Sequence, residues 1–169
     1  MIDAAVIPVA VALGSNLGDR ERLLRDAAAA LAPFIDDVRL SSFYETAPVG
    51  VGDDQPTFLN GALIGRTSLS ARALLERLLA VEQEFGRRRP YPGAARTLDL
   101  DLILYGDAVI EEPPTLIVPH PRFRERLFVL DPLAEIAGDW VDPVTGKSVM
   151  HLRDHASALT GQSTPEPRK

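Results

Sequence analysis

The fold is decided by residues 96–105, which read RTLDLDLILY. Side chains two positions apart on a strand share one face of the sheet. The alternation therefore predicts a strand over residues 97–105 with Asp99 and Asp101 together on one face. The leucines expected on the opposite face are Leu98, Leu100, Leu102 and Leu104.

Two aspartates at neighbouring positions of one strand face repel each other, and aspartate is a poor strand former. A divalent cation resolves both problems, and magnesium accepts a few carboxylates while leaving positions for phosphate oxygens and water. We therefore expect Asp99 and Asp101 to bind magnesium. The alternative is a half-exposed strand that carries two solvated aspartates.

The rest of the core follows from apolar periodicity. Strands are expected over residues 6–13, 38–46 and 58–67, and two helices are expected to begin after the N-caps Asp19 and Ser70. With the acidic strand, the order is β-α-β-β-α-β. This is the ferredoxin-like arrangement, an α+β fold whose antiparallel sheet carries both helices on one face.

The C-terminal part has weaker patterns. Residues 128–137 predict a short helix, and residues 141–147 predict a small hairpin. We expect one domain over residues 1–160 and a disordered tail over residues 161–169, which are polar and contain proline.

Composition restricts the class of protein. The chain has 169 residues, of which 46% are hydrophobic and 25% charged, as in an ordinary soluble globular protein. A net charge of −6 argues against a nucleic-acid binder with a broad basic surface. Without cysteine there is no disulfide and no thiol nucleophile. Since no signal segment and no apolar run of about 20 residues is visible, we expect a cytoplasmic protein without a membrane span.

Arginines gather beside the acidic strand. Arg87, Arg88 and Arg89 follow a predicted helix, and Arg96 directly precedes the strand. Guanidinium groups beside metal ligands fit a polyphosphate, because the metal bridges its oxygens and the arginines neutralise its charge. By itself, the triple arginine is equally well explained as a solvated cluster at the negative end of a helix.

A second basic segment lies at residues 118–126. It contains His120 between two prolines, followed by Arg122, Arg124 and Arg126. Next to phosphate-type residues, His120 is expected to donate a hydrogen bond to phosphate. The chain has no Gly-x-x-x-x-Gly-Lys-Ser/Thr motif, which excludes a P-loop kinase.

A site for a flat ring is predicted at Phe58 and Asn60. The two residues share a strand face, which places an aromatic plane beside an amide that both donates and accepts hydrogen bonds. Phe128 could supply a second stacking plane. The alternative is a core phenylalanine next to an asparagine that caps a strand.

With these residues in place, the sequence resembles the 6-hydroxymethyl-7,8-dihydropterin pyrophosphokinase family. The matching segments run in family order from about Val9 to Ile136. They are Leu13–Asp19, Ser42–Gly50, Gln55–Asn60, Glu82–Arg89, Arg96–Asp101 and Val118–Arg122.

The resemblance implies a ferredoxin-like enzyme that binds ATP, a pterin and two magnesium ions. It implies Asp99 and Asp101 as metal ligands. The residues expected to contact the nucleotide are Glu82, Arg87, Arg89, Arg96, Ile103, His120 and Arg126. Those expected to form the pterin pocket are Thr46, Pro48, Val49, Phe58, Asn60 and Phe128. Catalysis is assigned to Arg87, Arg89, Arg96, Asp99 and Asp101.

One segment departs from the family. Many members have Arg-Trp-Gly-Pro-Arg ending at the position of Arg96, whereas this chain reads Pro92-Gly93-Ala94-Ala95-Arg96. The usual arginine and tryptophan are therefore absent, and Arg88 and Tyr91 are the candidates to replace them.

The expected reaction is attack by the pterin hydroxymethyl oxygen on the β-phosphorus of ATP, with AMP leaving, on the way to folate. A neighbouring folate-pathway enzyme is a candidate partner. Two alternatives are kept: a nucleotidyl transferase or cyclase of the polymerase-palm kind, which releases pyrophosphate, and a non-catalytic ligand-sensing module, which consumes no ATP.

Overall fold

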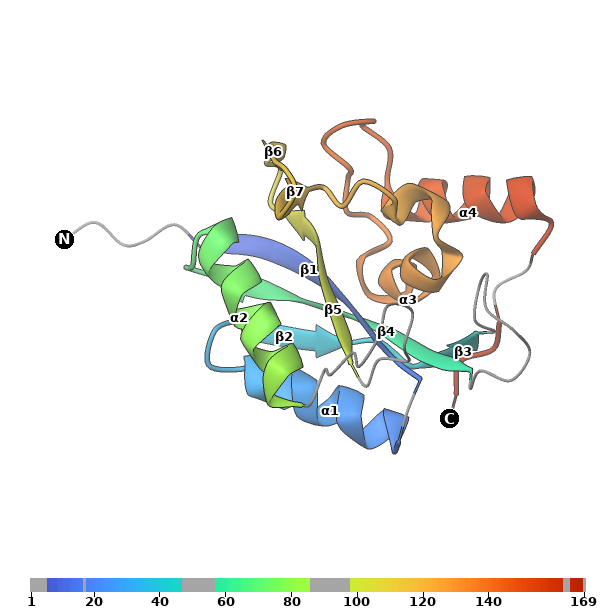
Figure 1. The fold of residues 1–169 in the computed structure, drawn as a ribbon. Helices are drawn as coiled ribbons and strands as arrows, with labels where there is room; N and C mark the ends of the chain where they lie inside the picture. Colours follow the sequence, from blue (N-terminus) through green and yellow to red (C-terminus); the bar gives the residue numbers. More distant parts are fainter. Residues whose placement is uncertain (1–5, 17, 47–56, 86–97, 163–164, 169) are drawn as a thin grey trace.

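The computed structural model describes residues 6–16, 18–46, 57–85, 98–162 and 165–168 (Figure 1). The elements in chain order are β1 (Ile7–Ser15), α1 (Arg20–Leu31), β2 (Asp36–Leu40), β3 (Tyr44–Thr46), β4 (Phe58–Thr67), α2 (Ala71–Glu84), β5 (Asp99–Tyr105), β6 (Ile110–Glu112), β7 (Leu116–Val118), the 3-10 turn η1 (Phe123–Glu125), α3 (Leu127–Ala137) and α4 (Val149–Thr160).

An antiparallel sheet of five strands forms the centre of the protein. Its order is β2-β4-β1-β5. Strand β3 pairs with the same edge of β4 as β2 does, but at residues 58–60, whereas β2 pairs at residues 63–66. The predicted side-chain caps of both core helices are present, since Asp19 accepts from Arg22 N and Ser70 accepts from Ala73 N. The element order confirms the predicted α+β class.

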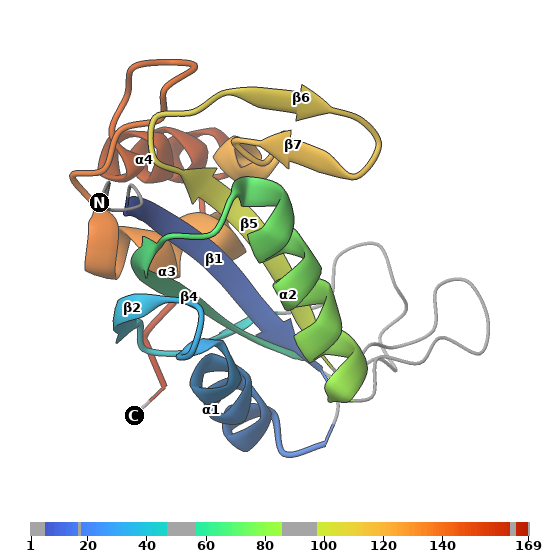
Figure 2. The same cartoon turned by 90° about the vertical axis from the view of Figure 1, so that its left-hand side faces the viewer.

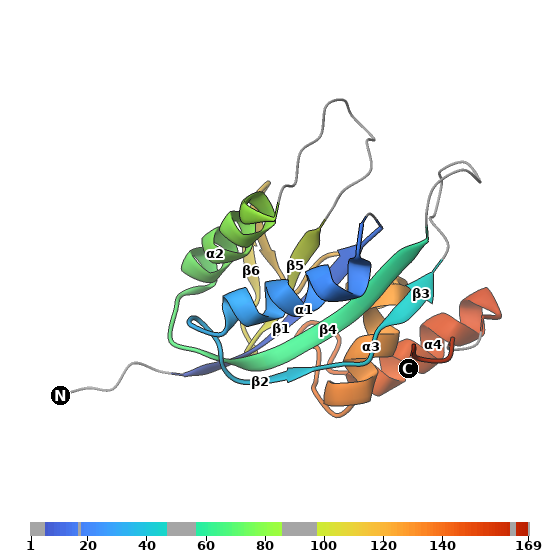
Figure 3. The same cartoon turned by 90° about the horizontal axis from the view of Figure 1, so that it is seen from below.

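The sheet separates two apolar cores. Helices α1 and α2 pack on one face, where Leu24, Leu31, Leu74 and Leu78 are fully buried. Helices α3 and α4 lie on the other face (Figure 3), where the core includes Leu130 and other residues of α3. The second face is therefore covered by the C-terminal part of the chain.

The predicted strand over residues 38–46 is wrong in its continuity, because β2 and β3 are separate strands. Between them, the Ser41 hydroxyl accepts from the Ala62 amide at 2.8 Å, in place of a backbone carbonyl. The Ser42 amide turns away to Glu135 Oε2 of α3, also at 2.8 Å. These side-chain contacts interrupt the regular ladder along β4.

The prediction that Leu104 shares a face with the other leucines of β5 is also wrong. The pairing of β1 with β5 shifts register between Ala10 and Val11. As a result, Ile103 and Leu104 both belong to the second core, whereas Leu100 and Leu102 stay in the first. An irregularity in a ladder interrupts the strict alternation of faces.

The C-terminal part contains elements that the sequence did not predict. Helix α4 and the β6–β7 hairpin (Figure 2) had no clear signal. The hairpin predicted at residues 141–147 is a turn closed by one bridge between Val141 and Ser148. The amide of Arg168 donates to the Phe43 carbonyl at 2.7 Å. None of the described helices combines the length and hydrophobicity needed to span a bilayer.

A buried ion pair fixes the turn after α3 against η1. Asp142 is fully enclosed, and its carboxylate accepts two hydrogen bonds from Arg124, at 2.5 and 2.9 Å. Burial alone would raise the pKa of Asp142, but the bonds from Arg124, Thr145 and the Val144 amide outweigh it and lower the pKa to about 2. The pair ties together the segments on either side of α3.

Replacing Asp142 should therefore remove pH-dependent stability. A lowered native pKa means that the carboxylate stabilises the fold above pH 4, by on the order of 2 kcal/mol, and that this contribution is lost as pH falls toward 2. At pH 7, Asp142→Asn is expected to lower the free energy of unfolding by about 3 kcal/mol, because Arg124 loses its charged partner. The deficit relative to the wild type should shrink between pH 4 and pH 2.

Urea unfolding at several pH values would test this expectation. The control is Asp139→Asn, since Asp139 is exposed and nearby in the chain. A deficit that stays constant down to pH 2 would show that the pair does not act as described.

Candidate active site

Strand β5 presents its two aspartates on the sheet face opposite α1 and α2. Asp99 pairs with Gly14 and Asp101 with Ala12, whereas Leu98, Leu100 and Leu102 point into the first core. Asp99 is half-buried and Asp101 is exposed. The two carboxylates thus share a face, as the alternation predicted.

The outer edge of β5 is held by Glu82. This residue of α2 is 3% exposed, and its Oε2 accepts from the Leu100 amide at 2.8 Å. Leu100 lies between the two aspartates in sequence, so the bond fixes the backbone that carries them. Sequence resemblance assigned Glu82 to the nucleotide, and the structure gives it a buried contact with the acidic strand.

A row of paired residues crosses the sheet at Asp99. It runs from Tyr44 of β3 through Asn60 of β4 and Gly14 of β1 to Asp99 of β5, and we call it the Gly14 row. Strands are spaced about 4.8 Å apart, which places Asn60 and Asp99 on strands about 10 Å apart.

Glycine leaves room for the Asn60 side chain in the middle of this row. A Cβ atom at Gly14 would lie 3.1 Å from Asn60 Oδ1, closer than ordinary contact. The strand predicted over residues 6–13 ended just before Gly14, but Gly14 lies inside β1. Glycine within a strand often marks a close approach by another group, and this was the signal that could have identified the position.

The predicted pterin residues Thr46, Phe58 and Asn60 lie together. Asn60 is 5% exposed, and its Nδ2 donates to Thr46 Oγ1 at 2.7 Å. Thr46 pairs directly with Phe58, which is half-buried. An amide, a hydroxyl and an aromatic ring therefore occupy one end of the sheet.

The second predicted ring, Phe128, comes from the first turn of α3. Helix α3 packs on β3 and β4, on the face that carries Asn60. The Arg126 guanidinium lies 5.5 Å from the centre of the Phe128 ring, a cation–π contact. This contact joins a predicted pterin residue to a predicted nucleotide residue.

His120 lies near Asp101 and is held through its backbone and its ring. Its amide donates to the Ile103 carbonyl at 3.0 Å, and its Nδ1 accepts from the Arg122 amide at 3.2 Å. Burial lowers the pKa of His120; Asp101 opposes this effect, and Arg126 and Arg122 add to it. The imidazole is therefore neutral at pH 7, with its proton on Nε2 and available for donation.

Ile103, predicted to contact the nucleotide, and Arg124, one of the phosphate-type arginines, have other surroundings. The side chain of Ile103 is 1% exposed in the second core, so its described role is to accept the His120 amide through its carbonyl. Arg124 was grouped with the phosphate-type arginines, but it is paired with buried Asp142.

The remaining predicted residues lie outside the described ranges. They are Pro48, Val49, Arg87, Arg89 and Arg96, together with the loop positions Arg88 and Tyr91.

The metal-binding capacity of the described residues is small. Within residues 6–16, 18–46, 57–85, 98–162 and 165–168, no three His, Cys, Asp or Glu side chains gather into a metal site. Two carboxylates on one face suit a cation that completes its shell with phosphate oxygens and water. The donor set therefore fits magnesium bound together with a nucleotide.

A separate hollow of about 520 Å³ lies at the far end of the sheet, where Gly106, Arg39, Arg66 and Trp140 line it. Gly106 directly follows β5 and is seven residues beyond Asp99. Seven residues of extended strand span about 23 Å. The hollow is thus distinct from the acidic site.

Comparisons with known proteins identify the family of this chain. The family described as 7,8-dihydro-6-hydroxymethylpterin-pyrophosphokinase (HPPK) matches residues 10–138. A 2-amino-4-hydroxy-6-hydroxymethyldihydropteridine pyrophosphokinase of Synechocystis is 48% identical over 144 residues, which cover 84% of this chain and 72% of the relative. One of the same name from Bacillus subtilis is 51% identical over 128 residues, 75% of each chain.

Solved structures support the fold. A Plasmodium falciparum HPPK-DHPS triple mutant matches with a TM-score of 0.75 at 13% identity, over 95% of this chain. This chain spans 46% of that longer protein. The family match over residues 10–138 and the close relatives are decisive: the chain belongs to the 7,8-dihydro-6-hydroxymethylpterin-pyrophosphokinase family.

Proposed function

We propose that this protein transfers the pyrophosphoryl group of ATP to the hydroxymethyl group of 6-hydroxymethyl-7,8-dihydropterin, with release of AMP, in folate biosynthesis. The observation that carries the proposal is the Gly14 row, which places Asn60 and Asp99 on one sheet face with a glycine between them. One end of the row suits a ring and the other suits a metal-bound phosphate.

Asp99 and Asp101 are the proposed ligands for two magnesium ions. Their shared face fits this role, since the like charges repel unless a cation lies between or beside them. When held by Asp99 and Asp101, magnesium would neutralise the negative charge that moves during transfer. Glu82 keeps the backbone of this strand in place through the Leu100 amide.

The phosphates are proposed to receive hydrogen bonds from His120 and Arg126. The neutral imidazole donates through Nε2, because Nδ1 is already an acceptor for the Arg122 amide. By resemblance, Arg87, Arg89 and Arg96 complete the cationic set, and Glu82 and Ile103 contact the nucleotide.

The pterin is proposed to stack against Phe58 and Phe128 while Asn60 reads the edge of its ring. The bond from Asn60 Nδ2 to Thr46 fixes the orientation of the amide. Pro48 and Val49 complete the pocket by resemblance.

In the proposed reaction, the hydroxymethyl oxygen forms a bond to the β-phosphorus as the bond from that phosphorus to the AMP oxygen breaks. The hydroxyl proton is lost to solvent, and AMP keeps the electron pair of the broken bond. Alignment of the reactants and stabilisation of charge would supply most of the acceleration.

Substitution of either aspartate should nearly abolish turnover. Asp99→Ala and Asp101→Ala are each expected to lower kcat by at least about 100-fold, as is usual when a group that stabilises developing charge is lost. AMP formation from ATP, magnesium and the pterin is the measurement. Asp107→Asn is the control, because this exposed residue lies two positions after the end of the same strand.

The same assay separates the alternatives. Pyrophosphate release would indicate a nucleotidyl transferase or cyclase, and absence of ATP consumption would indicate a sensing module. Near-normal AMP formation by both alanine variants would refute the metal assignment.

Loss of the imidazole should weaken nucleotide binding selectively. A hydrogen bond to a charged group contributes about 1.5–3 kcal/mol, so His120→Ala should raise the Kd for ATP by about tenfold or more. Calorimetry with ATP and with the pterin separately is the measurement, and pterin affinity should change little. His151→Ala is the control, because His151 is an exposed residue of α4. Equal losses for both ligands would argue against a phosphate role.

Two further points belong to the proposal. The Arabidopsis thaliana and Plasmodium falciparum relatives are named as bifunctional folate-synthesis or HPPK-DHPS proteins. A neighbouring folate-pathway enzyme is therefore the proposed physical partner of this chain. A cytoplasmic location stays our prediction.

A further inference from the structure

The proposed pterin residues Thr46 and Phe58 lie at neighbouring strand ends. Thr46 is the last residue of β3, Phe58 is the first residue of β4, and the two pair with each other. Ring binding at Phe58 and Asn60 requires that the ends of these strands keep a fixed separation. The contacts that hold the strand ends at this separation are therefore part of the site.

Arg20 connects the two strand ends. Its Nη1 donates to the Thr57 carbonyl at 2.9 Å and to the Thr57 hydroxyl at 2.8 Å. Its Nη2 donates to Glu45 Oε1 at 2.7 Å. Thr57 directly precedes Phe58, and Glu45 directly precedes Thr46, so one guanidinium holds a neighbour of each pocket residue. We call these contacts the Arg20 bridge.

The bridge acts from the opposite face of the sheet. Tyr44 points toward α3, where its hydroxyl donates to Glu135 at 2.6 Å, and alternation turns the next residue, Glu45, toward α1. Arg20 is the first residue of α1. It therefore fixes the strand ends without occupying the face proposed for the pterin.

Arg20 differs from the other arginines of its helix. Its side chain is 19% exposed, compared with 79% for Arg22 and 61% for Arg25. Arg22 and Arg25 form i,i+4 ion pairs within α1, with Asp26 and Glu21, and Arg25 also lies 5.1 Å from the centre of the Phe43 ring. A planar guanidinium that is already held loses little further freedom, and its rigid fork directs separate N–H donors at two groups, whereas a lysine ammonium is a compact charge on a flexible stem.

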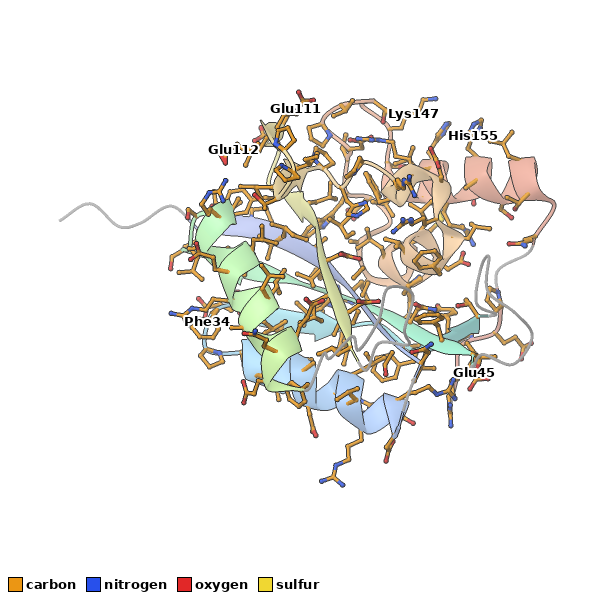
Figure 4. The ribbon with its side chains drawn as sticks, in the orientation of Figure 1. Phe34, Glu45, Glu111, Glu112, Lys147 and His155 are labelled. Atoms are coloured by element: carbon orange, nitrogen blue, oxygen red, sulfur yellow. The ribbon has the colours of Figure 1, made fainter. Side chains whose placement is uncertain are left out.

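A second arginine supports the same carboxylate. Arg168 donates to Glu45 Oε1 at 2.9 Å, and its amide bonds to the Phe43 carbonyl. In Figure 4, Glu45 lies at the end of the molecule where β3 and the C-terminus are found. Glu45 is thus fixed between the start of α1 and the last described residue.

We propose that Arg20 is a positioning residue for the pterin site. By tying Glu45 to Thr57 it sets the spacing of Thr46 and Phe58, and through Thr46 the orientation of Asn60. The inference rests on the proposed function, because it assigns these residues to the pterin.

The test compares binding of the two substrates by Arg20 variants of the full chain. Arg20→Ala should raise the Kd for the hydroxymethyl dihydropterin at least tenfold. The Kd for α,β-methylene ATP, which resists cleavage at the reacting bond, should change less than twofold. Arg22→Ala is the matched control, and both of its affinities should equal those of the wild type.

Two more variants guard against loss of folding. Arg20→Lys keeps the charge and most of the buried stem, and it should raise the pterin Kd at least threefold at an unchanged Tm. Glu45→Gln should also weaken pterin binding, and the double variant Arg20→Ala/Glu45→Gln should lose less than the product of the two single effects, because both act through one bridge.

The outcomes are distinct. Wild-type pterin affinity in Arg20→Ala and Arg20→Lys would overturn the inference. Equal losses of pterin and nucleotide affinity, in step with a lowered Tm, would also overturn it and assign Arg20 to general stability. Failure of the wild type to bind pterin or to release AMP would instead refute the proposed function.

Discussion

The pairing of β5 with β1 is the constraint on which the rest of the structure depends. It places Leu100 and Leu102 in the first core and leaves Asp99 and Asp101 on the other face. A slip by one residue would bury two carboxylates and expose the leucines, so the apolar core enforces the register that the acidic site needs. Stability and chemistry are therefore specified by the same alternation.

The sequence predicts the central fold well because its signals are local. Alternation identified β5 and the shared face of its aspartates, and helical spacing with Asp19 and Ser70 as caps identified α1 and α2. The features that the sequence did not predict depend on residues that are distant in the chain. The break at Ser42 requires Glu135, 93 residues away, and the register shift at Ala10 has no signature of its own.

The same distinction applies to the site. Asn60, Thr46 and Phe58 were chosen by residue type and resemblance, and they lie together in the described structure. Arg124 had the same composition signal as Arg126, yet it faces buried Asp142. Arg20 had no signal, because its two partners are 25 and 37 residues away. Charge type alone does not reveal which arginines have a protein partner.

The second core ends at a definite row of the sheet. Ala12 and Ala62 are its last members on that face, and Ala12 is paired with Asp101; the Gly14 row comes next. Packing and the proposed ligand site thus occupy consecutive segments of the same three strands. Substitutions at the Gly14 end of the sheet would therefore alter the proposed site while the other end continues to provide thermodynamic stability.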